Sequence, residues 1–149
     1  MNRFLKFDQN TGILIAEAGI TLHEISDIIV PTGWFLPVIP GSAQVTLGGA
    51  IASDVHGKNH FHAGSFSQHL LWLEIITAKR DLIQCSLNEN TALFLATIGG
   101  MGLTGLISTA CLQLKRIESP FMFVQTETCS NLEETLTRLN ERAITHEYC

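Results

Sequence analysis

Basic residues are scarce in this sequence. Nine Lys and Arg stand against fourteen Asp and Glu, which gives a formal net charge of −5. The basic residues are also scattered along the chain rather than gathered into a patch. Proteins that bind nucleic acid use such a patch to neutralise phosphates, so we expect no nucleic-acid partner.

Long apolar runs are missing as well. No uninterrupted apolar stretch approaches the roughly 18 residues of a membrane-spanning helix. The N-terminal stretch MNRFLKFDQNTG interrupts its apolar residues with charged ones, which is not the pattern of a secretory signal. These absences predict a soluble, cytoplasmic protein without a membrane span.

Paired cysteines are the third absence. Cys85, Cys111, Cys129 and Cys149 lie far apart and form no CxxC pair. Most of them have apolar neighbours, which favours buried thiols over metal ligands or disulfides. We expect Cys149 to be exposed.

Several motifs that would name a reaction are also absent. There is no GxSxG nucleophile elbow, so hydrolase chemistry is a poor fit. The stretch HGKN lacks the upstream glycine and the following Ser or Thr of an ATP-binding loop. GMGLTG matches GxGxxG, but a helix-like segment precedes it and a strand-like one follows, the reverse of the order in dinucleotide-binding folds. We interpret it as a chance match.

Enough apolar side chains are present for one compact core, because 46% of the 149 residues are hydrophobic. Residues 3–7 and 12–19 predict a hairpin with a turn at 10–12. Further strands are predicted over residues 69–78, 82–87, 103–117 and 121–129. Strands and helices mix without strict βαβ alternation and without a linker or repeat, which indicates an α+β fold in a single domain.

Four helices are predicted from periodicity and capping signals. Residues 21–30 have a capping box at Thr21 and Glu24, and Pro31 ends the helix. A short helix over residues 47–53 has Thr46 as its N-cap. The other two are a helix of about two turns within residues 86–100 and an amphipathic helix over 130–144 with a capping box at Ser130 and Glu133. We expect the amphipathic helix to face a partner.

The stretch PGSAQVTLGGAIASDVHGKNH, residues 40–60, contains few side chains large enough to fill space. After Thr46, the small residues Gly48, Gly49, Ala50 and Ala52 let the backbone approach a ligand near a helix start. Free N–H groups there favour an anion such as a pyrophosphate. A tight packing turn explains the same spacing equally well, and spacing alone does not name the ligand.

Histidines and one lysine cluster just after this helix. His56, His60 and His62 are spaced to bind zinc if His69 or Asp54 supplied a fourth ligand. Surface histidines with one or two internal hydrogen bonds are the default interpretation. Lys58 is either a solvated cation or an electrophilic group that faces a substrate oxyanion, and the residues alone leave both open.

Five motifs occur together in this part of the chain: PG(S/T), TxGGAIA, HGKNH, AGSF and ATxGGxGLTGI. They lie in FLPVIPGSAQVTLGGAIASDVHGKNHFHAGSFSQH and LFLATIGGMGLTGLI. Their combination is far more specific than any single glycine motif. On these motifs the sequence resembles the FAD-linked oxidases of the vanillyl-alcohol oxidase type, which have a PCMH-type FAD-binding domain.

The resemblance implies the second lobe of such a domain: an α+β fold with a mixed or antiparallel sheet and flanking helices. Residues 1–149 would form a single partial FAD-binding domain, from which the first FAD lobe and the substrate domain are absent. It implies noncovalent FAD, because the histidine that tethers flavin in some relatives belongs to the first lobe. A partner chain would supply the missing parts, and the isolated chain is expected to form a homo-oligomer through the face left uncovered.

The resemblance also assigns roles by position. Residues 40–42 would run along the flavin and pyrophosphate, and Gly102 and Ile107 along the adenine and ribose. The isoalloxazine edge would be lined by Ala52, Ser53, Val55 and His56. Lys58 matches a lysine beside the substrate, where a cation polarises the alcohol oxygen or stabilises charge near the flavin. The full set of implied cofactor contacts is Pro40, Gly41, Ser42, Thr46, Gly48, Gly49, Ala52, Ser53, Val55, His56, Gly102 and Ile107.

Three functions therefore compete. The first is the FAD-binding lobe of an oxidoreductase that oxidises a sugar-like secondary alcohol by hydride transfer to FAD. The second is a noncatalytic remnant that keeps the fold and holds FAD weakly or not at all, since one lobe makes only part of the contacts. The third is a histidine-cluster metal-binding protein. Whether the chain by itself is an enzyme stays open.

Overall fold

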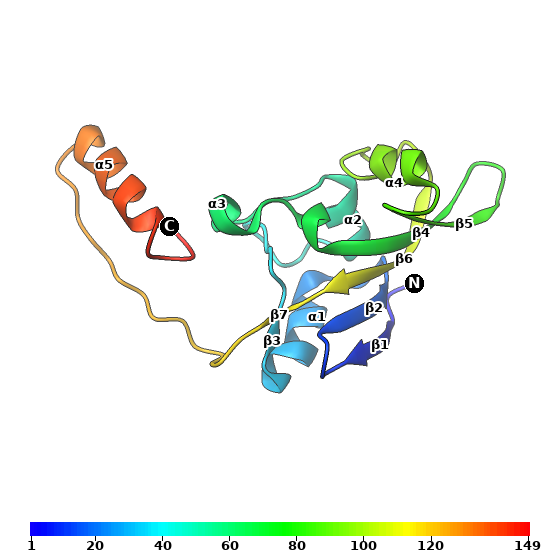
Figure 1. Ribbon diagram of the computed structural model, residues 1–149, viewed down its shortest axis with the longest axis horizontal. Coiled ribbons are helices and arrows are strands. Elements are labelled where there is room, and N and C mark those ends of the chain that lie inside the picture. Colours follow the sequence, from blue (N-terminus) through cyan, green and yellow to red (C-terminus); the bar gives the residue numbers. More distant parts are fainter.

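The computed structural model describes residues 1–149 and has the expected α+β fold (Figure 1). Its centre is a five-stranded sheet with the order β1-β2-β6-β4-β5, in which every neighbouring pair is antiparallel. The strands are β1 (Phe4–Asp8), β2 (Ile13–Glu17), β4 (Leu70–Ile76), β5 (Leu82–Ser86) and β6 (Leu106–Gln113).

The first hairpin forms where the turn residues predict it. Gly12 has a φ of +73°, and a Cβ at this position would lie 2.1 Å from the ring of Trp34. Trp34 is buried, and its ring nitrogen donates to the carbonyl of Gln9. Only glycine therefore meets both the backbone and the packing requirement of this turn.

The strand predicted over residues 103–117 is divided in two. β6 ends at Gln113, and β7 (Lys115–Arg116) pairs with β3 (Trp34–Phe35) in a separate two-stranded sheet. Leu114 lies between them, is 4% exposed, and donates its N–H to the carbonyl of Gly12. Burial of this side chain turns the strand away from the main sheet, a change that its apolar run does not reveal.

Three helices pack on the sheet and enclose the core: α1 (Leu22–Ile29), α2 (Leu47–Ala52) and α4 (Thr91–Thr97). The predicted capping box of α1 is present, with Thr21 and Glu24 each bonded to the other's backbone N–H. Pro31 lies in the 3-10 turn η1 (Val30–Thr32) that follows. The largest fully buried side chains are Phe94, Leu14, Leu22, Ile25, Ile29, Leu36, Leu47, Ile51, Leu73, Ile75, Leu112 and Val38.

Two short helical turns, α3 (His60–Ala63) and η2 (Phe66–His69), connect α2 to β4. None of the helices combines the length and the apolar character that a membrane crossing requires. All four cysteines are free, with Cys85 and Cys111 buried and Cys149 exposed, as the sequence predicts. Burial raises the pKa of the Cys85 and Cys111 thiols, which keeps them protonated and unreactive.

The predicted strand over residues 121–129 does not form. This segment contains no regular secondary structure, and Phe121 and Phe123 are 87% and 90% exposed. A strand needs a neighbour to accept its backbone hydrogen bonds, and no other strand lies beside this one. The segment leads away from the sheet to α5 (Leu132–Ala143), which lies apart from the main body (Figure 1).

Helix α5 begins one residue later than predicted. Asn131, not Ser130, is the N-cap, and its side chain accepts the N–H of Glu134. Ser130 donates its N–H and its hydroxyl to the Glu134 carboxylate, so the reciprocal partner is Glu134 rather than Glu133. No residue of α5 is buried. The partner expected for its apolar face stays a prediction.

Candidate functional site

The start of α2 is joined to the turn that follows β2. Leu47 donates its N–H to the carbonyl of Ile20 at 2.8 Å, and Gly48 donates to that of Ala18 at 2.7 Å. A Cβ at Gly48 would lie 3.0 Å from the Cβ of Ala18. A tight packing turn therefore explains why residue 48 is a glycine.

The expectation of free N–H groups at this helix start is wrong for Gly48 and Gly49. The Gly49 N–H donates to the Thr46 hydroxyl at 3.1 Å, so the predicted N-cap is present and uses this donor. The N–H groups of Leu47 and Gly48 donate to Ile20 and Ala18. The first turn of α2, from Leu47 to Gly49, therefore has no free donor for an anion.

Free donors occur a few residues earlier. The amide N–H groups of Gly41, Ser42, Ala43, Val45 and Thr46 make no hydrogen bond within the chain. Gly41 is exposed, and a Cβ there would meet no atom within 4 Å. Its φ also lies outside the left-handed region. Neither packing nor conformation within the chain requires this glycine, which fits a backbone that an external ligand approaches closely.

The second glycine-rich segment packs onto the end of α2. Gly99 donates its N–H to the carbonyl of Ile51 at 3.1 Å, and Met101 donates to that of Ala52 at 2.8 Å. Gly102 has a φ of +76°. Helix α4 precedes this segment and β6 follows it, so its GxGxxG match does not have the strand-to-helix order of dinucleotide-binding folds.

These two segments enclose a cavity of about 420 Å³, within the range of small-molecule sites. None of the side chains in its wall is charged, and the wall presents the hydroxyls of Thr46 and Ser53. Seven of the predicted cofactor residues line it, namely Thr46, Gly48, Gly49, Ala52, Ser53, Gly102 and Ile107. Five others, Pro40, Gly41, Ser42, Val55 and His56, lie outside its wall, and so does Lys58.

The cavity suits an uncharged part of a ligand. It contains no cationic side chain that would neutralise a diphosphate. The free N–H groups of residues 41–43 are better placed for an anion, because they point to no acceptor within the chain. The site therefore fits a ligand whose apolar ring lies in the cavity and whose diphosphate lies beside the N–H groups of residues 41–43.

An ion pair holds the N-terminal segment beside this cavity. Arg3 donates from Nε and Nη2 to Glu17 at 3.0 and 2.7 Å, and Met1 forms part of the cavity wall. The side-chain hydrogen bond from Arg3 holds the pKa of Glu17 below its ordinary value. The carboxylate thus stays charged and keeps this contact at neutral pH.

The loop after α2 carries Lys58 on a well-defined backbone. Asp54 has a φ of +42°, and its carboxylate accepts the N–H of Ser67 at 2.9 Å. His56 forms a β-bridge with Ser65. Lys58 itself is exposed. Its side chain is therefore free to face a ligand from a loop that is held on both sides.

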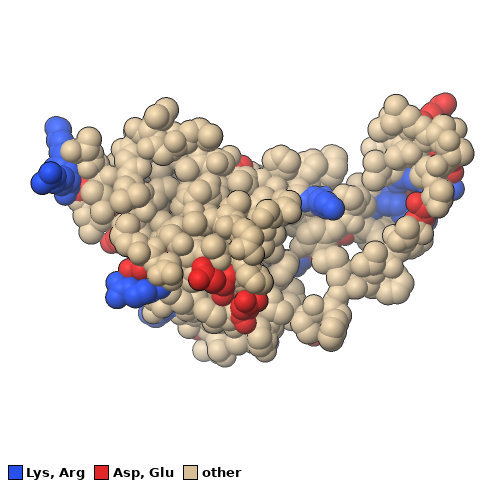
Figure 2. Space-filling view, turned by 180° about the vertical axis from the view of Figure 1, so that it is seen from behind, with Lys and Arg blue, Asp and Glu red and all other residues tan.

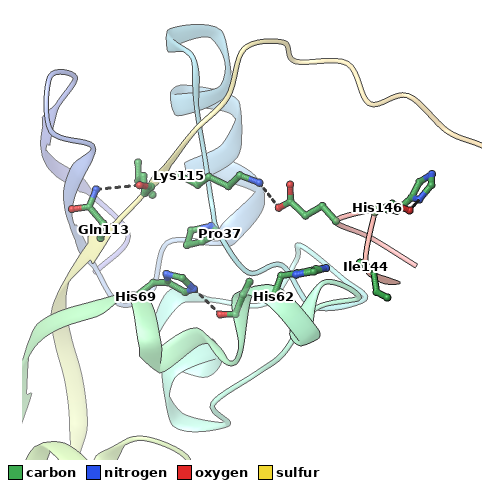
Figure 3. A pocket seen from close by; sticks show the side chains of 11 residues that line it. Pro37, His62, His69, Gln113, Lys115, Ile144 and His146 are labelled. Atoms are coloured by element: carbon green, nitrogen blue, oxygen red, sulfur yellow. Dashed lines mark hydrogen bonds and ion pairs between the residues drawn. The ribbon is translucent and has the colours of Figure 1, made fainter. Parts of the chain in front are cut away.

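The histidines do not form a metal site. No three His, Cys, Asp or Glu residues are placed to hold a metal ion. His62 Nε2 lies 2.6 Å from the carbonyl oxygen of Ala143, and His69 Nε2 lies 2.9 Å from that of Ala63. Figure 3 shows both rings at a separate cavity of about 510 Å³, beside the ion pair of Lys115 and Glu147. The zinc hypothesis is wrong because the fold does not bring three possible ligands together, and a backbone carbonyl already bonds one ring nitrogen of His62 and one of His69.

Several residues of the site have no role in the sequence interpretation. Ala18 and Leu106 line the cavity, yet the sequence pattern predicts no role for them beyond the strands over residues 12–19 and 103–117. Asn59 is almost completely buried beside Lys58. Its place in the HGKN stretch was the one available signal for it.

Charge on the surface agrees with the composition. Figure 2 shows one face as mostly uncharged, with a few separate acidic and basic side chains on it and others on the C-terminal segment. No basic patch of the kind that binds nucleic acid is visible on that face.

Comparison with known proteins identifies the fold and its ligand. A family model described as FAD binding domain matches residues 1–86. The chain is 36% identical over 137 residues to decaprenylphosphoryl-beta-D-ribose oxidase of Mycolicibacterium smegmatis, covering 91% of this chain and 30% of that protein. It is 30% identical over 148 residues to L-gulonolactone oxidase of Bos taurus, covering 99% of this chain and 33% of that protein.

An uncharacterized protein of Streptomyces coelicolor is 42% identical over 129 residues, covering 87% of this chain and 35% of that protein. The chain thus spans about a third of the length of the curated relatives it matches. The motif resemblance and the family match agree. The chain belongs to the FAD-binding domain family of the FAD-linked oxidases, and its cofactor is FAD.

Proposed function

We propose that the chain is the FAD-binding lobe of an oxidoreductase that oxidises a sugar-like secondary alcohol. The observation that carries this proposal is the cavity between α2 and the 99–105 segment, which gathers seven of the residues that motif matching assigns to FAD. These residues come from segments that are far apart in the sequence. Their meeting in one uncharged cavity supports a shared ligand.

The residues would divide the cofactor between them. Ala52 and Ser53 would contact the isoalloxazine edge and Ile107 the adenine and ribose side, and all three line the cavity. The free N–H groups of Gly41 and Ser42 would donate to the diphosphate. FAD binding would be noncovalent.

Lys58 would carry the charge that the reaction needs. Bound FAD supplies the hydride acceptor. Lys58 would place its ammonium group near the substrate oxygen, where it stabilises the negative charge that develops as the alcohol loses its proton. Its exposed position on a held loop supports this role, because the side chain has no competing ion-pair partner.

The whole reaction would need further parts. We propose that a first FAD lobe and a substrate domain, in a partner chain or a longer protein, complete the cleft. Exposed apolar residues of the C-terminal segment support a partner there, among them Phe121, Phe123 and Leu132. In the absence of that partner we expect the chain to self-associate. Sedimentation that shows only monomer would count against this expectation. A cytoplasmic location stays a prediction from sequence.

Flavin retention tests the proposal. The purified chain is mixed with FAD and passed through a desalting column. Protein that elutes with the absorbance of bound flavin supports the proposed function. A colourless protein contradicts FAD binding by this lobe alone and favours the noncatalytic remnant.

A further inference from the structure

Asn59 is a buried amide with only one of its two ends satisfied. Its side chain is 1% exposed, and Nδ2 donates to the carbonyl oxygen of Pro37 at 2.9 Å. The Oδ1 atom is also buried, and it has no hydrogen-bond partner. An unpaired carbonyl oxygen lowers the stability of the fold, so stability alone does not explain an asparagine here.

The asparagine is not there to cap a helix. Asn59 is the N-cap of α3, a position where asparagine usually accepts an N–H from the first turn. Its side chain makes no such bond. The backbone carbonyl of Asn59 instead accepts the N–H groups of His62 and Ala63. The side chain turns the other way and joins two segments that are 22 residues apart.

Gly57 completes this contact. A Cβ on Gly57 would lie 2.7 Å from Asn59 Oδ1 and 2.8 Å from the carbonyl oxygen of Ile39. Gly57 and Asn59 are both buried, whereas Lys58 between them is exposed. The backbone on each side of Lys58 is thus packed against residues 37–39, which lead directly into the free N–H groups of Gly41 and Ser42.

We propose that Asn59 is a positioning residue that sets Lys58 relative to the segment 40–42. This proposal rests on the proposed function, because the proposed function is what places Lys58 beside the flavin. The hydrogen bond to Pro37 fixes the loop and the segment as one unit. Loss of that bond lets the lysine charge move away from the ligand while the core of the domain stays intact.

The first test needs no flavin. Amide hydrogen exchange is measured by mass spectrometry in the wild-type chain, in Asn59→Leu and in the control Asn140→Leu, whose asparagine is exposed on α5. Leucine has the same number and branching of heavy atoms as asparagine, and it removes the unpaired oxygen along with the donor. We expect faster exchange over residues 56–60 in Asn59→Leu alone. Unchanged exchange in that variant overturns the proposal. Asn59→Ala replaces it if the leucine variant does not fold.

The second test uses bound FAD. A lysine charge near the flavin favours its reduced form, so the ratio of the dissociation constants for oxidised and reduced FAD reports the position of that charge. We expect Lys58→Ala and Asn59→Leu each to weaken the preference for reduced FAD by about fivefold or more. The double variant should weaken the preference for reduced FAD no more than Lys58→Ala alone does, because Asn59 acts through the lysine.

The outcomes separate this inference from the proposed function. The positioning role is overturned if the two substitutions weaken the preference for reduced FAD additively, or if Asn59→Leu leaves the ratio of the two dissociation constants unchanged. Neither result contradicts FAD binding. A wild-type chain that binds no flavin overturns the proposed function and this inference together.

Discussion

Residues 1–117 and residues 118–149 differ in how they use apolar side chains. The first region contains the core, a single cluster of 23 buried residues. The second region contains no buried residue, although α5 has an apolar face. Leu22 in α1 is fully buried, whereas Leu136 in α5 is 53% exposed. Amphipathic periodicity alone therefore does not bury a helix, because burial also needs a complementary surface beside it.

Polar contacts, not packing, organise the C-terminal region. Arg138 bonds both Glu127 and Glu134, and Arg142 bonds Glu127. The hydrogen bonds of this region to the main body are the ion pair of Lys115 with Glu147 and the contact of the His62 ring with the Ala143 carbonyl. Ion pairs near the surface contribute little to stability. The two regions thus differ in kind, with a packed domain on one side and an exposed segment joined by ion pairs on the other.

The largest expected effect compares buried and exposed leucines. Leu73→Ala removes a side chain with no exposed area, and we expect it to lower the free energy of unfolding by about 2–5 kcal/mol. Leu136→Ala in α5 should change it by less than about 0.5 kcal/mol. Urea denaturation followed by circular dichroism measures both. Equal losses would show that α5 packs on the domain in solution.

The second prediction distinguishes a residue that contributes to the reaction from residues that stabilise the main body. In an enzyme that also contains the proposed first FAD lobe and substrate domain, Lys58→Ala should slow flavin reduction about a hundredfold, as the loss of one charge-stabilising group does. FAD should stay bound, and the unfolding midpoint should not move because Lys58 is exposed. Stopped-flow absorbance measures the reduction. Lys79→Ala, in the turn between β4 and β5, is the control, and an equal rate in both variants would refute the role of Lys58.

The third prediction compares two glycines of the same stretch. Gly48→Val forces a side chain against Ala18, so we expect a loss of about 1–3 kcal/mol in the free energy of unfolding. Gly41→Val meets no atom of the chain and should keep full stability while it reduces flavin retention. Thermal unfolding and desalting of the same samples measure both. Full retention by Gly41→Val would remove Gly41 from the cofactor site.

The smallest effect concerns the cap of α5. Hydrogen bonds from the backbone N–H and the hydroxyl of Ser130, with a further one from Arg138, lower the pKa of Glu134 from 4.5 to about 2. The charged carboxylate is therefore favoured in the folded helix, and its contribution is complete above pH 4.5 and is lost as the pH falls toward 2. Helix content should decline over this range. Glu134→Gln should flatten that part of the decline in circular dichroism, and an unchanged acid profile would contradict the cap.

Local signals in the sequence predict much of the packed domain. Thr21 with Glu24 and Thr46 mark the starts of α1 and α2 because capping depends on residues three positions apart. The turn at Gly12 likewise follows from local backbone preference. The same kind of signal was wrong by one residue at Ser130, since Asn131 competes there as a cap.

Contacts between distant residues account for what was not predicted. The end of β6 depends on burial of Leu114, and the missing strand over residues 121–129 on the lack of a neighbour. The N–H of Gly48 is used by Ala18, thirty positions away in the sequence. None of these partners can be read from a local pattern.

The sequence by itself determined the fold class, the main hairpins, the capped helices and the motifs of a FAD-binding domain. Those depend on backbone preference, periodicity and residue type, which act over a few positions. Only the tertiary structure decided which glycines are packed against the chain and which are open, that the histidines do not form a metal site, and that the Asn59 side chain bonds Pro37. These depend on which donors and acceptors meet, and folding brings them together from distant parts of the chain.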